Sequence, residues 1–285
     1  MIEKILLASN GPGNTEKMFK ALLELPIIQR AQVTVLQVVP TKAAANKMGD
    51  QLSDSKDQLA ETIKRLGIEE SKVTPLLKEG EPKDIVCKVA DDIDADLIIM
   101  GSRGLQGLQA IFANSVSQYV FQLSSRPMLL VKDDLYRIRP VNRILVALDK
   151  SDMSKETLKV ALTLARDNKS SELVFVHTLP NLRTSLAEAI NAKPETDPVL
   201  IPAVNEARKY GISYRCVAPE GKPGARICEL AEDVSADLIV LGSPDRRPSI
   251  AKGLPDIDRL LGGSLSDYVR INAPCPVLLT RIQSE

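Results

Sequence analysis

Three glycines and two serines follow a short apolar run in a pattern that suits phosphate binding. The run "DLIIM" shows no polar alternation and is typical of a strand buried on both faces, and "GSRGLQG" comes directly after it. Glycine lets the backbone approach a ligand, and the amides and dipole at the start of the following helix favour an anion. Ser115 and Ser117 add hydroxyl donors near that helix start. The same stretch also fits a tight turn with Asn114 or Ser115 as a helix cap, so the spacing leaves both interpretations open.

The composition excludes several classes of protein. Of the 285 residues, 44% are hydrophobic and 26% are charged, and the formal net charge is zero. A general nucleic-acid binder needs a basic excess to neutralise phosphates, so we expect no nucleic-acid partner. The apolar run near the N-terminus is too short for a signal peptide or a membrane span. We therefore expect a cytoplasmic protein with no membrane insertion.

Cysteine and histidine usage argues against a metal centre. The chain has one histidine, His177, and four cysteines without a C-x-x-C pair: Cys87, Cys216, Cys228 and Cys275. A zinc site needs clustered thiolate and imidazole ligands, so no metal site is predicted. The cysteines are interpreted as buried thiols in a reducing compartment.

The chain contains an internal duplication. The segment Glu79–Ser102 matches Glu220–Ser243 at 12 of 24 positions without a gap, at an offset of 141 residues. "KILLASNGPG" near the start matches "RILVALDKSD" at offset 139, and "RPMLLVK" matches "CPVLLTR" at offset 149. The order of matching blocks is the same in both halves, which predicts two domains over 1–135 and 141–285 joined by a linker at about 136–140.

Strand-like and helix-like segments alternate within each half. In the first half, strands are expected at 5–9, 33–39, 73–80, 96–100 and 127–132, and helices at 16–25, 44–66, 85–93 and 116–123. In the second half, strands are expected at 144–148, 173–179, 212–217, 237–241 and 276–281. This alternation predicts an α/β fold of two tandem doubly wound parallel five-stranded sheets with right-handed crossovers.

These segments resemble the universal stress protein family. The resemblance rests on "DLIIMGSRGLQGLQAIFANSVSQYVFQLSSRPMLLVK" and "RILVALDKSDMSKETLKVALTLA", and it extends over both halves in the same block order. It implies tandem universal stress domains with a flavodoxin-like or Rossmann-like sheet. Some family members bind ATP and others do not. The binding members carry Gly, two residues, Gly, nine residues, then Gly followed by Ser or Thr, and an Asp at the end of the first strand.

The first half matches most of that family pattern. Gly101 and Gly104 have the right separation, and nine residues then lead to Asn114 and Ser115, with Asn114 in place of the third glycine. Asn tolerates left-handed backbone conformations better than most residues, so the turn is compatible with it. The nucleotide contacts that the resemblance implies here are Asn10 (where binding members have Asp), Val38 (through its backbone to adenine), Gly101, Arg103, Gly104, Asn114, Ser115, Val116 and Ser117.

The second half departs from the pattern in a different way. Asp149 and Gly242 are present, but Asp245 replaces the second glycine and 17 residues separate it from Gly263. A carboxylate close to a triphosphate repels it. The inserted segment is interpreted as a solvated loop, although it carries three basic residues that offer another way to hold an anion: Arg246, Arg247 and Lys252. We therefore expect ATP, with or without magnesium, in the first half and a degenerate site in the second.

No catalytic residue is predicted. The serines of the glycine-rich loop have no histidine nearby in the sequence, and His177 stands where the family often has His, which favours a structural role. The chain is therefore interpreted as a stress-response regulatory or binding protein and not an enzyme, with slow ATP hydrolysis left open. The alternative is a nucleotide-independent module that binds an unknown protein partner. A related adenine-nucleotide enzyme is disfavoured by the glycine spacing and the tandem arrangement.

The last strand of each half is expected to mediate assembly. "PMLLVK" and "PVLLTR" are short, apolar and similar to each other, and an edge strand of this kind needs a partner. The resemblance implies that they pair within the chain and form a pseudo-dimer, and a homodimer of the chain is also consistent with the sequence.

Overall fold

The computed structural model describes residues 2–9, 11, 13–40, 48–102, 116–132, 135–179, 194–244 and 264–282. Strands and helices alternate through both halves, as predicted. The first half comprises β1 (Lys4–Ala8), α1 (Asn14–Leu23), η1 (Ile28–Arg30), β2 (Gln32–Val39), α2 (Met48–Leu66), η3 (Glu70–Lys72), β3 (Val73–Glu79), α3 (Pro82–Asp92), β4 (Leu97–Ser102), α5 (Val116–Leu123) and β5 (Met128–Lys132). The second comprises β6 (Arg143–Ala147), α6 (Met153–Ala165), β7 (Glu172–Val176), η4 (Pro194–Thr196), α8 (Ile201–Lys209), β8 (Ser213–Val217), α9 (Pro223–Asp233), β9 (Leu238–Gly242), α11 (Leu265–Asn272) and β10 (Val277–Thr280).

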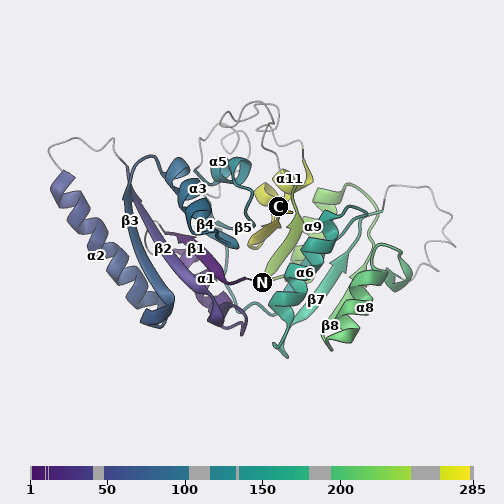
Figure 1. Cartoon of the computed structure of the whole chain (residues 1–285). Coiled ribbons are helices and arrows are strands. Elements are labelled where there is room, and N and C mark those ends of the chain that lie inside the picture. The colour runs from purple at the N-terminus through teal and green to yellow at the C-terminus, as the bar shows by residue number, and fades with distance from the viewer. Residues whose placement is uncertain are drawn as a thin grey trace.

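All the described strands belong to one sheet (Figure 1). The order β3-β2-β1-β4-β5-β10-β9-β6-β7-β8 contains the same five-strand arrangement twice, once in each half. Neighbours within each half are parallel, whereas β5 and β10 pair antiparallel with Leu129 opposite Leu278. The predicted pairing of the last strands is thus confirmed, and it merges the two predicted five-stranded sheets into a single ten-stranded one.

Helices cover both faces of this sheet and define two core layers. Buried side chains of α1, α2, α6 and α8 pack on one face, and those of α3, α5, α9 and α11 pack on the other. Phe19 of α1 and Phe121 of α5 are among the largest fully buried side chains of the two layers. Strands covered on both faces need apolar residues at successive positions, which explains the unbroken run of "DLIIM".

The first helix differs by two residues at each end from the predicted range. It spans Asn14–Leu23 instead of 16–25. Leu25 precedes Pro26. Proline disfavours the helical conformation of the residue before it, so the helix ends earlier than the apolar pattern predicts. At the other end, Asn14 Nδ2 donates to the carbonyl oxygens of Lys132 and Tyr136, at 3.3 and 2.8 Å, which anchors the first turn.

A buried lysine crosses the junction from the first half to the second. Lys132, at the end of β5, is 7% exposed, and its Nζ donates to the carbonyl oxygens of Ile271 (2.7 Å) and Ala273 (3.2 Å). These carbonyls lie at the C-terminal end of α11, where a cation also interacts favourably with the helix dipole. The contact ties the last strand of one half to the last helix of the other.

Arg281 occupies the equivalent position after β10, at the offset of 149 found in the sequence. It is 2% exposed, and its guanidinium donates to the carbonyl oxygens of Phe121 in α5 and of Ser243 and Pro244 after β9. The two cations therefore cross the junction in opposite directions. Arg281 also touches the backbone at the carboxyl end of β9.

The segment predicted as a linker packs against the protein. Tyr136 is 8% exposed and Val141 is 2% exposed, and Ile138 packs against the same core layer. Because this segment is short and is anchored in the core by Tyr136, the two halves lie close together.

Candidate functional site

Each half has a topological switch point at the carboxyl edge of the sheet. In the first half, β1 and β4 are neighbours, but the helices that follow them, α1 and α5, pack on opposite faces. In the second half, β6 and β9 are neighbours, and α6 and α11 diverge in the same way. Ligands of open α/β sheets bind in the crevice that this divergence opens.

The structure describes four of the predicted first-half contacts. Val38 is half-buried in β2, and Gly101 lies in β4 opposite Val131 of β5. Val116 and Ser117 begin α5, where Ser117 is 2% exposed. The other predicted contacts lie outside the described residues: Asn10, Arg103, Gly104, Asn114 and Ser115. The described backbone brings the ends of β2 and β4 to either side of β1, and the end of β4 is joined to the start of α5 by residues 103–115.

A buried carboxylate near this edge was not singled out from the sequence. Glu16 of α1 has a side chain that is 6% exposed, and it accepts hydrogen bonds from Arg65 Nε (3.1 Å) and Nη2 (3.1 Å) of α2. Thr62 Oγ1 (3.2 Å) and Ser9 Oγ (3.4 Å) donate to its Oε1. These four contacts neutralise and satisfy the carboxylate, so Glu16 holds α1, α2 and the end of β1 together.

Residues that the structure describes form a cleft at the switch point of the second half. It has a volume of about 410 Å³, within the range of small-molecule sites. The carboxyl ends of β6, β7 and β9 line it, together with the starts of α6, α9 and α11. Asp149, His177, Gly242 and Leu265 are among its lining residues. The cleft combines apolar walls with a few polar side chains.

Asp149 contributes a charged group to this cleft. It is exposed, and its Oδ1 accepts from Ser151 N (2.9 Å), Ser151 Oγ (2.5 Å) and Ser154 Oγ (2.7 Å). Partial desolvation by itself raises the pKa of Asp149. The hydrogen bonds from the two serines and the nearby His177 outweigh that effect and hold the pKa below its ordinary value. Asp149 is therefore a carboxylate at neutral pH.

His177 and Asp197 form a pair beside that carboxylate. His177 Nδ1 lies 2.8 Å from Asp197 Oδ2, and their side chains are 15% and 10% exposed. The sequence predicts a structural role for His177. In addition, His177 lines the cleft. Asp197 follows a long stretch without a motif, so no sequence signal pointed to it.

The first turn of α11 carries its own carboxylate. Ser264 Oγ accepts from Asp267 N (3.2 Å) and donates to Asp267 Oδ2 (2.8 Å), and Arg270 Nη2 lies 3.6 Å from Asp267 Oδ1. Asp267 is 2% exposed. Ser264 thus acts as a helix cap, the structural alternative considered for the equivalent Ser115. At the offset of 149, the first half has the neutral Gln118 in place of Asp267.

Gly242 has a packing role. A Cβ at this position would lie 2.2 Å from Met153 Cγ and 3.2 Å from Thr157 Oγ1. Any side chain would therefore push α6 away from the end of β9. This explains a glycine at this place without reference to phosphate.

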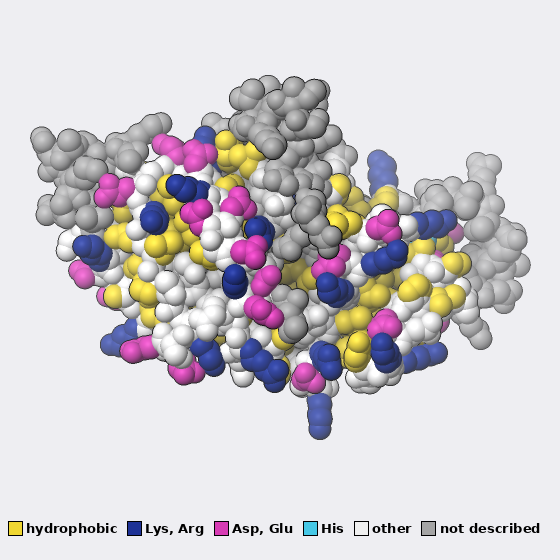
Figure 2. Space-filling model, viewed as in Figure 1, with side chains coloured by type: hydrophobic (Ala, Val, Ile, Leu, Met, Phe, Trp, Pro, Cys, Tyr) yellow, Lys and Arg dark blue, Asp and Glu magenta, His cyan; other side chains and the backbone are white. Residues whose placement is uncertain are grey.

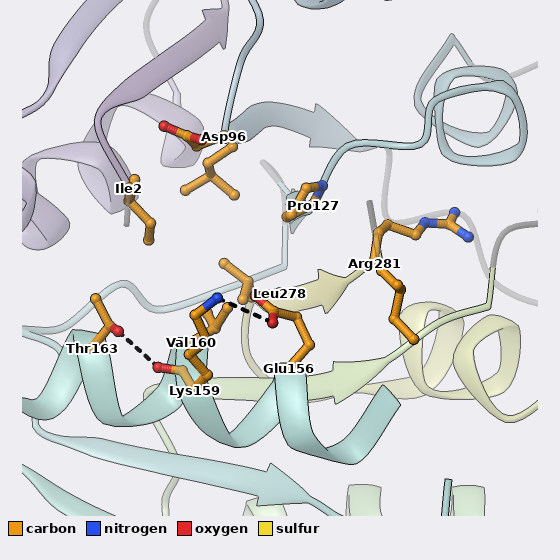
Figure 3. Close-up of a pocket in the computed structure, with 11 residues that line it drawn as sticks. Ile2, Asp96, Pro127, Glu156, Lys159, Val160, Thr163, Leu278 and Arg281 are labelled. Carbon is orange, nitrogen blue, oxygen red and sulfur yellow. Dashed lines mark hydrogen bonds and ion pairs between the residues drawn. The ribbon is translucent and has the colours of Figure 1, made fainter. Parts of the chain in front are cut away.

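A second cavity lies between the two halves (Figure 3). It has a volume of about 320 Å³, and Figure 3 shows Ile2, Asp96 and Pro127 of the first half facing α6 of the second. Lys159 Nζ of α6 pairs with Glu156 at 3.4 Å within the lining. The guanidinium of Arg281 points away from the cavity, toward its carbonyl partners. None of the four described nucleotide contacts, Val38, Gly101, Val116 and Ser117, is among its lining residues.

The described surface and side chains add four observations. Figure 2 shows basic and acidic side chains mixed over the visible face. Within the described ranges, no group of three or more His, Cys, Asp or Glu side chains suits a metal ion. The described helices include none that is long and apolar enough to cross a membrane. Cys275 is buried as expected, whereas Cys87, Cys216 and Cys228 are only half-buried.

Comparison with known proteins gives a consistent result over both halves. The profile of the universal stress protein family matches residues 1–132 and 140–281. The universal stress protein YxiE of Bacillus subtilis is 28% identical over 155 residues, covering 49% of this chain and 99% of its own length. A universal stress protein structure from Archaeoglobus fulgidus covers 99% of this chain and 97% of its own, with 23% identity and a TM-score of 0.73. A putative universal stress protein from Pseudomonas aeruginosa covers 98% of this chain and 93% of its own, with 16% identity and a TM-score of 0.61. These two structures have the same fold as this chain.

Proposed function

Since the chain belongs to the universal stress protein family, we propose that it is a regulatory protein that binds an adenine nucleotide and carries no dedicated catalytic group. The first half is the proposed site of ATP, through the loop that joins β4 to α5. The second half holds a different, degenerate site. Nucleotide binding then changes the surface next to that loop, and a protein partner recognises the changed surface.

The observation that carries this proposal is the cleft at the second-half switch point. It has the size of a small-molecule site, and it is lined by the ends of β6, β7 and β9, the strands equivalent to β1, β2 and β4 of the first half. Because the two halves share one strand order, an equivalent crevice is expected beside β1 and β4.

Charge favours the first half for a polyanion. Gln118 of α5 is neutral at the position where the second half has Asp267 in the first turn of α11. The Asp267 carboxylate would oppose a phosphate at that helix start, whereas the Gln118 amide offers a hydrogen-bond donor. The glycine spacing in the first half allows close backbone approach to phosphate oxygens.

Calorimetric titration of the full chain with ATP, with and without magnesium, tests the proposal. The wild-type chain is expected to bind ATP, and Gly104→Asp is expected to abolish binding while leaving the circular dichroism spectrum unchanged. Asp245 stands at the equivalent position of the second half, so Asp245→Gly serves as the control. This control should leave ATP affinity in place, because it does not alter the first-half loop.

Two results would overturn the nucleotide proposal. One is the absence of ATP binding by the folded wild-type chain, and the other is unchanged affinity in Gly104→Asp. Either result would favour the nucleotide-independent interaction module.

A further inference from the structure

We propose that the cavity between the two halves binds an extended peptide in which a large aliphatic residue directly precedes an arginine. The cavity, of about 320 Å³, lies where Ile2, Asp96 and Pro127 face α6 (Figure 3). These three residues come just before β1, β4 and β5, so the cavity is at the amino ends of first-half strands. The proposal is therefore independent of the nucleotide site, which is expected at the carboxyl ends of those strands.

The duplication provides a counterpart of this cavity on the other side of the junction. Asp96 corresponds to Asp237 at the offset of 141. Asp96 Oδ2 accepts from Glu3 N (2.8 Å) and Lys4 N (2.9 Å). Asp237 Oδ2 accepts from the two equivalent amides around the start of β6, at 3.1 and 2.8 Å. The two aspartates are thus held in the same way, so their remaining carboxylate oxygens occupy equivalent positions.

The chain's own linker covers the counterpart position. It runs from Lys132 to Val141. The counterparts of these two residues, Arg281 and Ile2, both line the cavity. A segment that joined them as the linker joins its two ends would therefore pass over the cavity. The described part of the chain supplies no such segment, so we expect it to come from another molecule.

Two contacts of the linker define what that segment should carry. Ile138 is half-buried and packs against the core layer that includes α1 and α6. Arg139 Nε lies 3.4 Å from Asp237 Oδ1, the carboxylate oxygen that the backbone amides leave available. An aliphatic side chain followed by an arginine thus satisfies both an apolar surface and a carboxylate oxygen.

The cavity offers the same two features. Its apolar walls come from both halves: Leu97, Pro127, Val160 and Leu278. Among the described residues, none pairs with Asp96 Oδ1, whereas Oδ2 is occupied by the two backbone amides. Asp96 is half-buried in the lining, so an arginine bound there would form a charge-assisted hydrogen bond that is partly shielded from solvent.

The other charges of the described lining are already balanced. Lys159 Nζ pairs with Glu156 at 3.4 Å. The guanidinium of Arg281 turns away from the cavity and donates to backbone carbonyl oxygens. Asp96 is therefore the charge that a ligand can neutralise, which favours a cationic segment over an acidic one.

Fluorescence anisotropy with the full chain tests the proposal, and the labelled probe is the peptide LYRIRPV, the sequence of residues 135–141. We expect saturable binding with a dissociation constant of about 100 μM, because a short peptide loses conformational freedom when it binds. Replacing the isoleucine by serine (LYRSRPV) or the second arginine by glutamine (LYRIQPV) should weaken binding about tenfold. Replacing the first arginine (LYQIRPV) is the matched control and should change the affinity less than about twofold, because Arg137 is exposed in the linker.

Two variants of the protein locate the bound peptide. Asp96→Asn keeps an oxygen for the backbone amides but removes the charge, and it should weaken peptide binding about tenfold. Val160→Phe fills the cavity from α6 and should abolish binding, with thermal unfolding as the check on the folded state. Asp92→Asn is the matched control for Asp96→Asn, because Asp92 is exposed and does not line the cavity.

The proposal is overturned by any of three results: no saturable binding to the folded full chain, equal binding of LYRIRPV and LYRIQPV, or undiminished binding in Asp96→Asn or Val160→Phe. Binding that appears only after removal of the residues beyond Ile282 would also overturn it, because the chain's own end would then be the occupant. ATP binding that depends on Gly104 is measured separately, so either proposal can fail while the other stands.

Discussion

The two halves share a scaffold but differ at the carboxyl edge of the sheet. The first half pairs Gln37 Nε2 with Gln58 Oε1 at 2.9 Å, where the second half has the pair of His177 and Asp197. Two further positions differ in the same way. The first half has Asn10 and Gln118, and the second half has Asp149 and Asp267 at the equivalent positions. The first half has uncharged amide side chains at all these positions, and the second half has three aspartates and a histidine there.

The ion pairs on the first helix of each half differ in burial. Glu16 is enclosed by Arg65, Thr62 and Ser9, whereas the equivalent Lys155 pairs with Asp152 on the surface, where both side chains are more than 80% exposed. Equivalent backbone positions in the two halves therefore carry different charged side chains. The apolar core fixes the strands and helices, but it does not fix which polar residues stand at the edge of the sheet. The difference predicts that the halves have separate ligand preferences.

The largest expected effect concerns the cations that join the halves. Arg281→Met should lower the free energy of unfolding by about 3 kcal/mol, because buried carbonyl oxygens lose their donors. Lys132→Met removes two such contacts and should cost about 2 kcal/mol. Urea denaturation checks both values. Equal stability of wild type and both variants would mean that the junction does not depend on these cations.

A smaller effect is expected at the two equivalent ion pairs. Glu16→Gln should cost about 1–2 kcal/mol, because Glu16 is buried but Arg65 can still be hydrated at its 35% exposed side chain. Lys155→Gln on the surface is the matched control and should leave the urea midpoint unchanged. A larger loss in the control than in Glu16→Gln would reverse the comparison between the halves.

The pH dependence of stability should separate Asp149 from its neutral counterpart. A carboxyl group whose pKa is lowered in the folded protein stabilises it above the ordinary pKa of about 4, and this stability is lost as the pH falls through the folded value. Between about pH 5 and about pH 2, the free energy of unfolding should therefore fall more steeply for wild type than for Asp149→Asn. Parallel curves in urea titrations over this range would show that Asp149 makes no such contribution.

The smallest expected difference concerns two equivalent cysteines. Burial, with added repulsion from Asp91 and Asp84, raises the pKa of Cys87 to about 12. Burial also raises the pKa of Cys228 to about 11, with nearby Lys132 opposing the rise. Both thiols should react slowly with iodoacetamide at about pH 8, and Cys228 should react before Cys87, as followed by peptide mass spectrometry. Rapid modification of either thiol in the folded chain would contradict this expectation.

Much of the fold could be predicted from local patterns. The repeat of "ADLIIMGS" as "ADLIVLGS" and the alternation of apolar strands with helical stripes indicated the duplicated parallel architecture. Helix ends were less predictable, as at α1, where Pro26 outweighs the apolar periodicity. Of the candidate site, the sequence identified Asp149 and the first-half glycines. It did not indicate Asp197, Asp267 as a helix-start carboxylate or Arg281, because their partners are distant in the chain or depend on helix geometry.

The sequence by itself determined a duplicated α/β architecture, because apolar runs encode buried strands and apolar residues three or four positions apart encode helix faces. Its motifs also carry the resemblance to the universal stress protein family, whose profile matches both halves. Only the tertiary structure decided the antiparallel register of β5 and β10, with Leu129 opposite Leu278, and the contact of His177 with Asp197 beside Asp149. Contacts between residues far apart in the chain depend on how strands are ordered and how loops return. That information arises only when the whole core is packed.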